Sequence, residues 1–240
     1  LKALPEGGVV GVLECATHSG DAVRVLELAH SAPYFHAAIG IHPESLIEED
    51  AATVAVYHGD WRAELAAMRP LFEDKSVAAV GEIGLDHHWT VPRQEQYDLF
   101  EAQLQLAKEL DLPVSVHDRE AHAEMYELLR KYKPRGALHC YSGSADDAAW
   151  LVEQGMYLGF GGAVTYKGAK RAAKVLAAIP HERALLETDC PYMAPEPVRG
   201  TRNDSRNIAH VAAYIGTIWD MDAQAVLDQT AQNARACFGV

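Results

Sequence analysis

Residues 77–86 read Val-Ala-Ala-Val-Gly-Glu-Ile-Gly-Leu-Asp, and they set a pattern that recurs along the whole chain. The first four residues are short, apolar and without a polar face, which is typical of a strand buried on both sides in a parallel sheet. A carboxylate, Glu82, comes soon after this run. Other runs of the same character predict further strands at 9–13, 37–41, 113–116, 136–138, 156–160 and 184–186.

Longer stretches with helical spacing of their apolar residues separate these runs. The clearest extends from Arg93 to Leu110. Strands that alternate with helices predict parallel strands joined by crossover helices. Further helices are expected near 21–30, 61–69, 120–132, 145–154, 167–179, 205–219 and 222–238.

The expected fold class is therefore α/β, as a TIM-like (β/α)8 barrel that forms a single domain over residues 1–240. Such a barrel has eight strands in roughly 250 residues. We count seven runs, and the chain begins with Leu1 instead of Met, so we expect the first strand to be missing at the N-terminus. A doubly wound open sheet is the competing architecture, but it would normally carry a glycine-rich phosphate loop after its first strand, and we find none.

Imidazoles and carboxylates follow five of the expected strands. Because the carboxyl ends of the strands form the active site of such barrels, these side chains would converge on one mouth. Each one alone is more often a solvated or hydrogen-bonded structural residue. Together they would gather like charges in a partly enclosed place, which costs free energy unless a cation or a proton neutralises them. The predicted metal ligands are Glu82, His117, His139 and Asp189, and His42 is the fifth residue of the group.

Imidazole nitrogens and carboxylate oxygens suit a divalent metal, one or two ions of Zn, Mn, Mg or Fe. Such an ion lowers the pKa of a bound water towards ~7 and draws charge from a phosphoryl or carbonyl oxygen. Asp189 is the natural acceptor of the proton from that water, and Glu82 has two oxygens with which to bridge two ions. These two residues are the predicted catalytic pair.

The composition of the chain limits the kinds of binding partner and cellular compartment that can be expected. A formal net charge of −13 argues against binding of long duplex nucleic acid, which relies on Lys and Arg, but it does not exclude a small or single-stranded substrate. The four cysteines form no C-x-x-C pair and fit buried free thiols in a reducing compartment. We find no signal peptide and no apolar run near the ~18–20 residues that span a bilayer. The expectation is a cytoplasmic monomer without a membrane partner.

Six ordered motifs carry a more specific indication. They are Ala-Ile-Gly-Ile-His-Pro (38–43), Gly-Glu-Ile-Gly-Leu-Asp (81–86), Pro-Val-Ser-Val-His-Asp-Arg-Glu (113–120), Leu-His-Cys-Tyr-Ser-Gly (138–143), Glu-Thr-Asp-Cys-Pro-Tyr (187–192) and Arg-Gly-Thr-Arg-Asn (199–203). In residues and in order, this set resembles the TatD-family metal-dependent hydrolases over nearly the whole chain.

The resemblance implies an amidohydrolase-type barrel that uses the four ligands named above. It also implies a deoxyribonuclease or 3′–5′ exonuclease that cleaves phosphodiester bonds through a metal-activated water, with DNA ends or short single-stranded oligonucleotides as substrate. On the same basis His42 would lie at the substrate, and Arg202 and Asn203 would contact phosphate. Arg119, two residues after His117, would hold either a phosphate or a neighbouring carboxylate. The ring side chains of Tyr192, Trp89 and His88 would either pack or stack on a base.

Two departures from the family pattern leave alternatives open. Many members carry a His-x-His pair at the end of the first strand, and this chain has none, either because the pair lies upstream of Leu1 or because this member lacks it. Asn203-Asp204-Ser205 stands where the family more often has Asn-Glu-Pro. The alternative functions are a metallohydrolase of an amide, lactone or cyclic amide on the same barrel, and a non-catalytic scaffold.

Overall fold

The computed structural model describes residues 3–240. Its contacts divide the chain into two compact units. The first unit is Gly11–Gly136 with Val240, and the second is Ala137–Gly239 with the described residues up to Val10. The expected single domain stays a prediction. None of the described helices combines the length and apolar character needed to cross a membrane.

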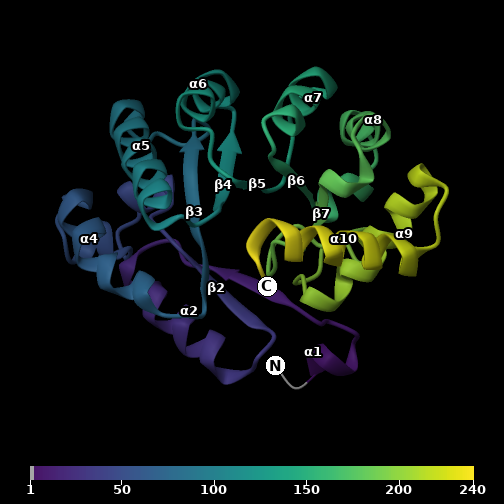
Figure 1. The fold of residues 1–240 in the computed structure, drawn as a ribbon, viewed down its shortest axis with the longest axis horizontal. Coiled ribbons are helices and arrows are strands. Elements are labelled where there is room, and N and C mark those ends of the chain that lie inside the picture. The colour runs from purple at the N-terminus through teal and green to yellow at the C-terminus, as the bar shows by residue number, and fades with distance from the viewer. Residues whose placement is uncertain (1–2) are drawn as a thin grey trace. The chain divides into compact units, whose positions relative to one another are not determined.

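The first unit contains four parallel strands in the order β1-β2-β3-β4. Helices accompany them, and Figure 1 shows α5 and α6 alongside β3 and β4. The strands are β1 (Val12–Cys15), β2 (Phe35–Ile39), β3 (Val77–Asp86) and β4 (Val114–Arg119). The helices are α2 (Ser19–Ser31), η1 (Pro43–Leu46), α3 (Ala52–Ala55), α4 (Trp61–Met68), η2 (Arg69–Glu73), α5 (Arg93–Leu110) and α6 (His122–Tyr132).

Strand β3 is longer than the apolar run at 77–80 that predicted it. It continues to Asp86 because Ile83 and Leu85 are buried and pair with β4, after a register shift between Val80 and Ile83. Gly84 makes this pairing possible. Its φ is +151°, and a Cβ there would lie 1.9 Å from the carbonyl oxygen of His117. Glu82 therefore lies within a paired strand and not in the loop after it.

The other strands lie close to the predicted ones. Strand β1 begins at Val12, later than the predicted 9–13, because Val10 is exposed while Glu14 and Cys15 pair with β2. Helix α5 has the predicted bounds. It ends where Asp111 takes a left-handed conformation (φ 54°) and donates its backbone N–H to the carbonyls of the last turn.

The second unit contains three parallel strands in the order β5-β6-β7. Helix α10 packs on β7, and its Asn233 donates hydrogen bonds to the carbonyls of His181 and Ala184 at the start of that strand (2.7 Å each). The strands are β5 (Gly136–Leu138), β6 (Tyr157–Phe160) and β7 (Ala184–Leu186). The helices are α1 (Ala3–Glu6), α7 (Ala145–Glu153), η3 (Gly162–Thr165), α8 (Lys170–Ala178), η4 (His181–Arg183), η5 (Ser205–Asn207), α9 (Ile208–Trp219) and α10 (Ala223–Phe238).

All seven predicted strands are thus present and parallel within their units, which confirms the α/β class. The expected eighth strand, upstream of Leu1, lies outside the described residues.

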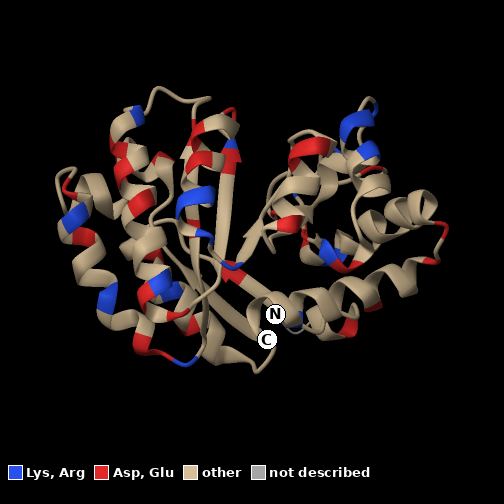
Figure 2. Ribbon diagram, turned by 45° about the horizontal axis from the view of Figure 1, so that its top comes forward, with Lys and Arg blue, Asp and Glu red and all other residues tan. Residues whose placement is uncertain are grey.

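Basic and acidic residues are interspersed along the helices of the first unit, as the colouring of the ribbon in Figure 2 shows. Lys131 of α6, for example, lies 2.6 Å from Glu101 of α5. The hydrogen bond from Lys131 lowers the pKa of Glu101. These outer helix faces are ordinary solvated surface with charges paired across neighbouring helices.

Candidate metal centre

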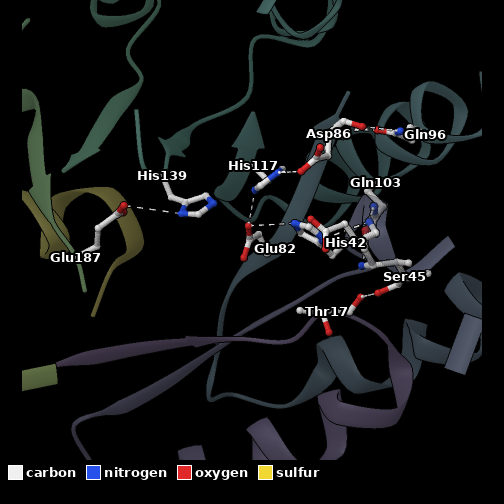
Figure 3. Close-up of polar contacts among 12 residues, drawn as sticks. Thr17, His42, Ser45, Glu82, Asp86, Gln96, Gln103, His117, His139 and Glu187 are labelled. Carbon is white, nitrogen blue, oxygen red and sulfur yellow. Dashed lines mark hydrogen bonds and ion pairs between the residues drawn. The ribbon is translucent and has the colours of Figure 1, made fainter. Parts of the chain in front are cut away.

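Three side chains of the first unit meet in the carboxyl-terminal halves of neighbouring strands and just after one of them. Glu82 comes from β3, His117 from β4 and His42 from the turn after β2. Glu82 Oε1 lies 3.1 Å from His117 Nδ1 and 3.4 Å from His42 Nε2 (Figure 3). One potential ligand atom from each of the three lies within 4.8 Å of the others. The cluster has the nitrogen and oxygen donors of a divalent-cation site.

His117 is oriented by a carboxylate that the sequence did not single out as a site residue. Its Nε2 lies 2.9 Å from Asp86 Oδ2, and Asp86 is fully buried. Burial alone would raise the pKa of Asp86. Hydrogen bonds from His117 and from the backbone N–H groups of His88 and Trp89 outweigh that effect and lower the pKa to about 2.

Because Asp86 is ionised, it accepts a hydrogen bond, so the proton of His117 lies on Nε2. The Nδ1 lone pair of His117 is then directed at the space beside Glu82. This is the usual arrangement of a metal-binding histidine, whose second nitrogen donates to a carboxylate. The donor set and its support therefore fit a divalent ion with Glu82 and His117 as ligands.

His42 is oriented in the opposite sense. Its Nδ1 accepts a hydrogen bond from the backbone N–H of Glu44 (3.2 Å), so the proton of the neutral ring lies on Nε2, facing Glu82. A protonated Nε2 donates and does not ligate. His42 is close enough to the cluster to be a ligand, but its hydrogen bonds favour a donor to Glu82 or to a substrate oxygen.

Two glutamines of α5 hold the backbone around these residues, and sequence reasoning missed both. Gln103 accepts from the N–H of Ile41 (2.7 Å) and donates to its carbonyl (3.0 Å), directly before His42. Gln96 does the same for Asp86, at 2.7 and 2.8 Å. Both side chains are fully buried, and Figure 3 shows Gln96 beside Asp86 and Gln103 beside His42. Their spacing of seven residues puts them on one helix face, and that spacing amid apolar positions is the signal that would have found them.

A second cluster lies in the second unit, where His139, Cys140 and Glu187 bring potential ligand atoms within 4.8 Å of one another. Glu187 Oε1 accepts the backbone N–H of Cys140 (2.6 Å) and lies 3.8 Å from His139 Nδ1. Gly159 leaves the space for this carboxylate, since a Cβ there would lie 2.2 Å from Glu187 Oε2. Glu187 directly follows the apolar run at 184–186, but it was not among the ligands predicted from the sequence.

Burial and the negative charge of Glu187 raise the pKa of the Cys140 thiol, which is therefore neutral. A neutral thiol is a poor ligand for a hard or borderline cation. His139 and Glu187 are the better donors of this cluster.

Asp189 lies just after β7 in a left-handed backbone conformation (φ 51°). Asn203 braces this loop, since its amide nitrogen donates to the carbonyls of Thr188 and Tyr192 (2.7 Å each). Asn203 is buried, whereas Arg202 is exposed. The predicted contacts of both residues with phosphate stay predictions.

The structure thus brings together Glu82 and His117 of the predicted ligands, with His42 beside them, in the first unit. In the second unit it places His139 with Glu187. Joint coordination by the predicted set of four, and the catalytic assignments of Asp189 and Glu82, stay predictions.

Parallel strands with helices between them, and imidazole–carboxylate clusters towards the carboxyl ends of the strands, are features found in the class of metal-dependent hydrolases. Within that class the chain belongs to the family of TatD-related DNases, whose model matches residues 1–239.

Individual relatives agree with this assignment. The chain is 36% identical over 224 residues to the uncharacterised metal-dependent hydrolase YabD of Bacillus subtilis, covering 90% of this chain and 82% of that protein. It is 31% identical over 252 residues to the 3′-5′ ssDNA/RNA exonuclease TatD of Erwinia tasmaniensis, with coverage of 100% and 92%.

The crystal structure of YjjV, a TatD homologue from Escherichia coli K12, superposes with a TM-score of 0.89 at 31% identity, covering 100% of this chain and 90% of that one. The expected TIM-like α/β fold and the TatD resemblance are both confirmed. The chain is accordingly a metal-dependent hydrolase of the TatD type.

Proposed function

We propose that this protein removes nucleotides from the 3′ end of single-stranded DNA by phosphodiester hydrolysis that depends on one or two divalent ions. The observation that carries the proposal is the Glu82–His117 pair with its buried orienting carboxylate, Asp86. Membership of the TatD family and the exonuclease name of the Erwinia relative support the bond and the substrate. Imidazole ligands favour Mn²⁺, Zn²⁺ or Fe²⁺ over Mg²⁺.

A divalent ion at this site would supply positive charge that polarises a phosphoryl oxygen and makes water more acidic. The protein's own groups would do the rest. Glu82 and His117 would hold the ion. Asp86 keeps the proton of His117 on Nε2, so that the lone pair of Nδ1 would bind the ion. The protonated Nε2 of His42 would donate to a substrate oxygen, which is the substrate contact predicted from the sequence. Asp189 would accept the proton of the attacking water.

The acidic surface fits a short single strand better than a duplex, because little basic surface is available for phosphate contacts. The four cysteines are free thiols, which supports the expected cytoplasmic location, but only Cys237 is buried and Cys190 is exposed, so the expectation of buried thiols was wrong for Cys190. That location and the monomeric state remain part of the proposal.

The test combines metal analysis with cleavage of a 5′-labelled single-stranded oligonucleotide, with added Mn²⁺, Mg²⁺ or Zn²⁺ or with a chelator. We expect bound metal, and a ladder of products that shorten from the 3′ end only when metal is present. Asp189→Asn should keep the metal but lose at least about 100-fold in rate, the range for a general base. Asp220→Asn is the matched control, because Asp220 also has a left-handed backbone (φ 55°) but caps the end of α9.

Metal-loaded protein that leaves all DNA intact but hydrolyses amides or lactones would show that the substrate class is wrong. Protein that holds no metal would overturn the proposal and favour a binding scaffold.

A further inference from the structure

The loop after β3 carries a large aromatic side chain that the core does not take up. Trp89 is 48% exposed. Tryptophan has the largest apolar side chain, and it is usually well buried on average. A half-exposed indole next to a candidate active site is therefore informative.

A cation lies over this indole. The Arg119 guanidinium carbon is 5.7 Å from the centre of the Trp89 ring, and His88 meets the same ring edge-on at 4.9 Å. Arg119 is exposed, and within residues 3–240 its guanidinium has no ion pair or hydrogen bond beside this ring contact. His88 is already engaged with Glu120 at 3.0 Å. The available partners for a ligand are thus the exposed part of the Trp89 ring and the charge of Arg119.

The same carboxylate that orients His117 also holds this pair in place. Asp86 accepts the backbone N–H of His88 (2.8 Å) and that of Trp89. Asp86 is also the register partner of Arg119 across the β3–β4 pairing. The Trp89–Arg119 pair is therefore tied to a proposed metal ligand through one buried side chain.

An arginine over a tryptophan is often only a surface contact, and the first unit contains such a case for comparison. Arg62 lies 4.0 Å from the centre of the Trp61 ring. There, however, Trp61 is 4% exposed, and Arg62 lies 3.4 Å from the carboxylate of Asp98. That arginine covers a buried ring and is neutralised. The pair at Trp89 has neither property.

We propose that Trp89 and Arg119 form a stacking site for an unpaired base of the nucleic-acid strand whose phosphodiester lies at the metal centre, an inference that rests on the proposed function. The indole would stack on the base, and the guanidinium of Arg119 would contact the adjoining phosphate or extend the stack. Every base has a stacking face, so this site discriminates little between sequences. A base paired within a duplex is not available to it, so the site selects single strands.

Stacking also accounts for how a chain of net charge −13 would retain a nucleic acid. Affinity that comes from an aromatic contact and one arginine depends weakly on salt, because few counterions are released on binding. We expect a slope of log Kd against log salt of about 1 to 2 for the intact protein, and lower by about 0.7 in Arg119→Ala, since a single strand releases that much per phosphate contact.

The decisive measurement is binding of a fluorescent single strand of about 8 nucleotides, a length within the usual range for single-strand sites. The protein carries its metal, and the strand has phosphorothioate linkages that resist hydrolysis. Trp89→Ala should weaken binding about 5- to 30-fold, the lower part of the range for loss of one stacked base. Trp89→Phe should restore most of the affinity. Arg62→Ala is the matched control. Its affinity for the strand should stay within about twofold of that of the intact protein, because Arg62 covers the buried ring of Trp61 and is paired with Asp98.

A second measurement separates this inference from the proposed function. The hydrolysis of a normal 3′ end is compared with that of an end whose terminal nucleotides lack bases. Trp89→Ala should slow hydrolysis of the normal end and leave the abasic end unchanged.

If no strand is cleaved but Trp89→Ala still weakens binding, the proposed function fails and the stacking site stands. If cleavage proceeds and Trp89→Ala binds as well as the intact protein, the stacking site is refuted and the function stands. Failure of the intact protein to bind a single strand would overturn the stacking site. Because Trp89 is half exposed, the variants should fold, which circular dichroism checks.

Discussion

Replacement of Asp86 by asparagine tests the reasoning about the metal centre most directly. The change keeps the size of the side chain and removes its charge. Asp86 now accepts hydrogen bonds on both oxygens, from His117 Nε2 on one and from the backbone N–H of His88 on the other. An asparagine has only one oxygen in the same place, so one of these two donors must face an NH2 group whichever way the amide turns.

If the amide nitrogen faces His117, the imidazole proton moves to Nδ1, the atom that would bind the metal. If it faces His88, a buried backbone donor loses its acceptor. Loss of a group that orients a metal-binding histidine typically costs about 10–100-fold in metal affinity, or about 1.4–2.7 kcal/mol. We expect Asp86→Asn near the upper end, because Asp86 is fully buried and water cannot replace the lost acceptor.

The assay is a competition for Mn²⁺ or Zn²⁺ between the protein and a fluorescent chelator. Asp98→Asn is the control, since Asp98 lies on the exposed side of α5 with Arg62 beside it. The pKa of Asp86 is about 2, so the wild-type carboxylate stays ionised at all usual assay pH values. The affinity ratio between the two proteins should then not change with pH through this group. A folded Asp86→Asn protein whose metal affinity is within threefold of wild type would refute the assignment of His117 and Asp86.

Three further substitutions probe the site and the strands of the first unit. Gln103→Leu should lower the free energy of unfolding in urea by about 2–5 kcal/mol, because the buried N–H and carbonyl of Ile41 each lose a partner; a loss below about 1 kcal/mol would contradict this. Gly84→Ala should prevent accumulation of folded protein, whereas Gly59→Ala, also at positive φ but with open space around it, should cost only about 1–2 kcal/mol in thermal denaturation. Burial raises the pKa of Glu14, so its ionised form is destabilising and stability falls as pH rises through that pKa. Glu14→Gln should therefore raise the melting temperature more at pH 7 than at pH 4, and an equal change at both would count against a buried carboxylate.

The fold was largely predictable because its determinants are local. Short apolar runs and the helical spacing of 93–110 identify strands and helices without reference to the rest of the chain. The continuation of β3 was not predictable in this way. Gly81 and Gly84 look like a turn in the sequence, and only the pairing of Ile83 with Val116 makes the segment a strand.

The site was predictable where a reactive side chain directly follows a short apolar run, as for His117 after 113–116 and His139 after 136–138. Asp86 was missed because its function depends on a histidine 31 positions away. Glu187 was not selected because residue type alone cannot distinguish it from Asp189. The position of the Glu187 carboxylate depends on the space that Gly159 leaves in β6, and no local sequence pattern reveals that space.

The two buried glutamines of α5 fix the spacing of two backbone segments at the metal centre. The two turns of helix between Gln96 and Gln103 correspond to a rise of about 10.5 Å. Gln96 is hydrogen-bonded to the backbone of Asp86 and Gln103 to that of Ile41. Substitutions on the solvent side of α5 leave this spacing unchanged. Insertion or deletion of one residue between the two glutamines would rotate one of them by about 100° and detach it. The solvent side of the helix can therefore diverge in composition during evolution, but between these two positions the helix cannot change in length.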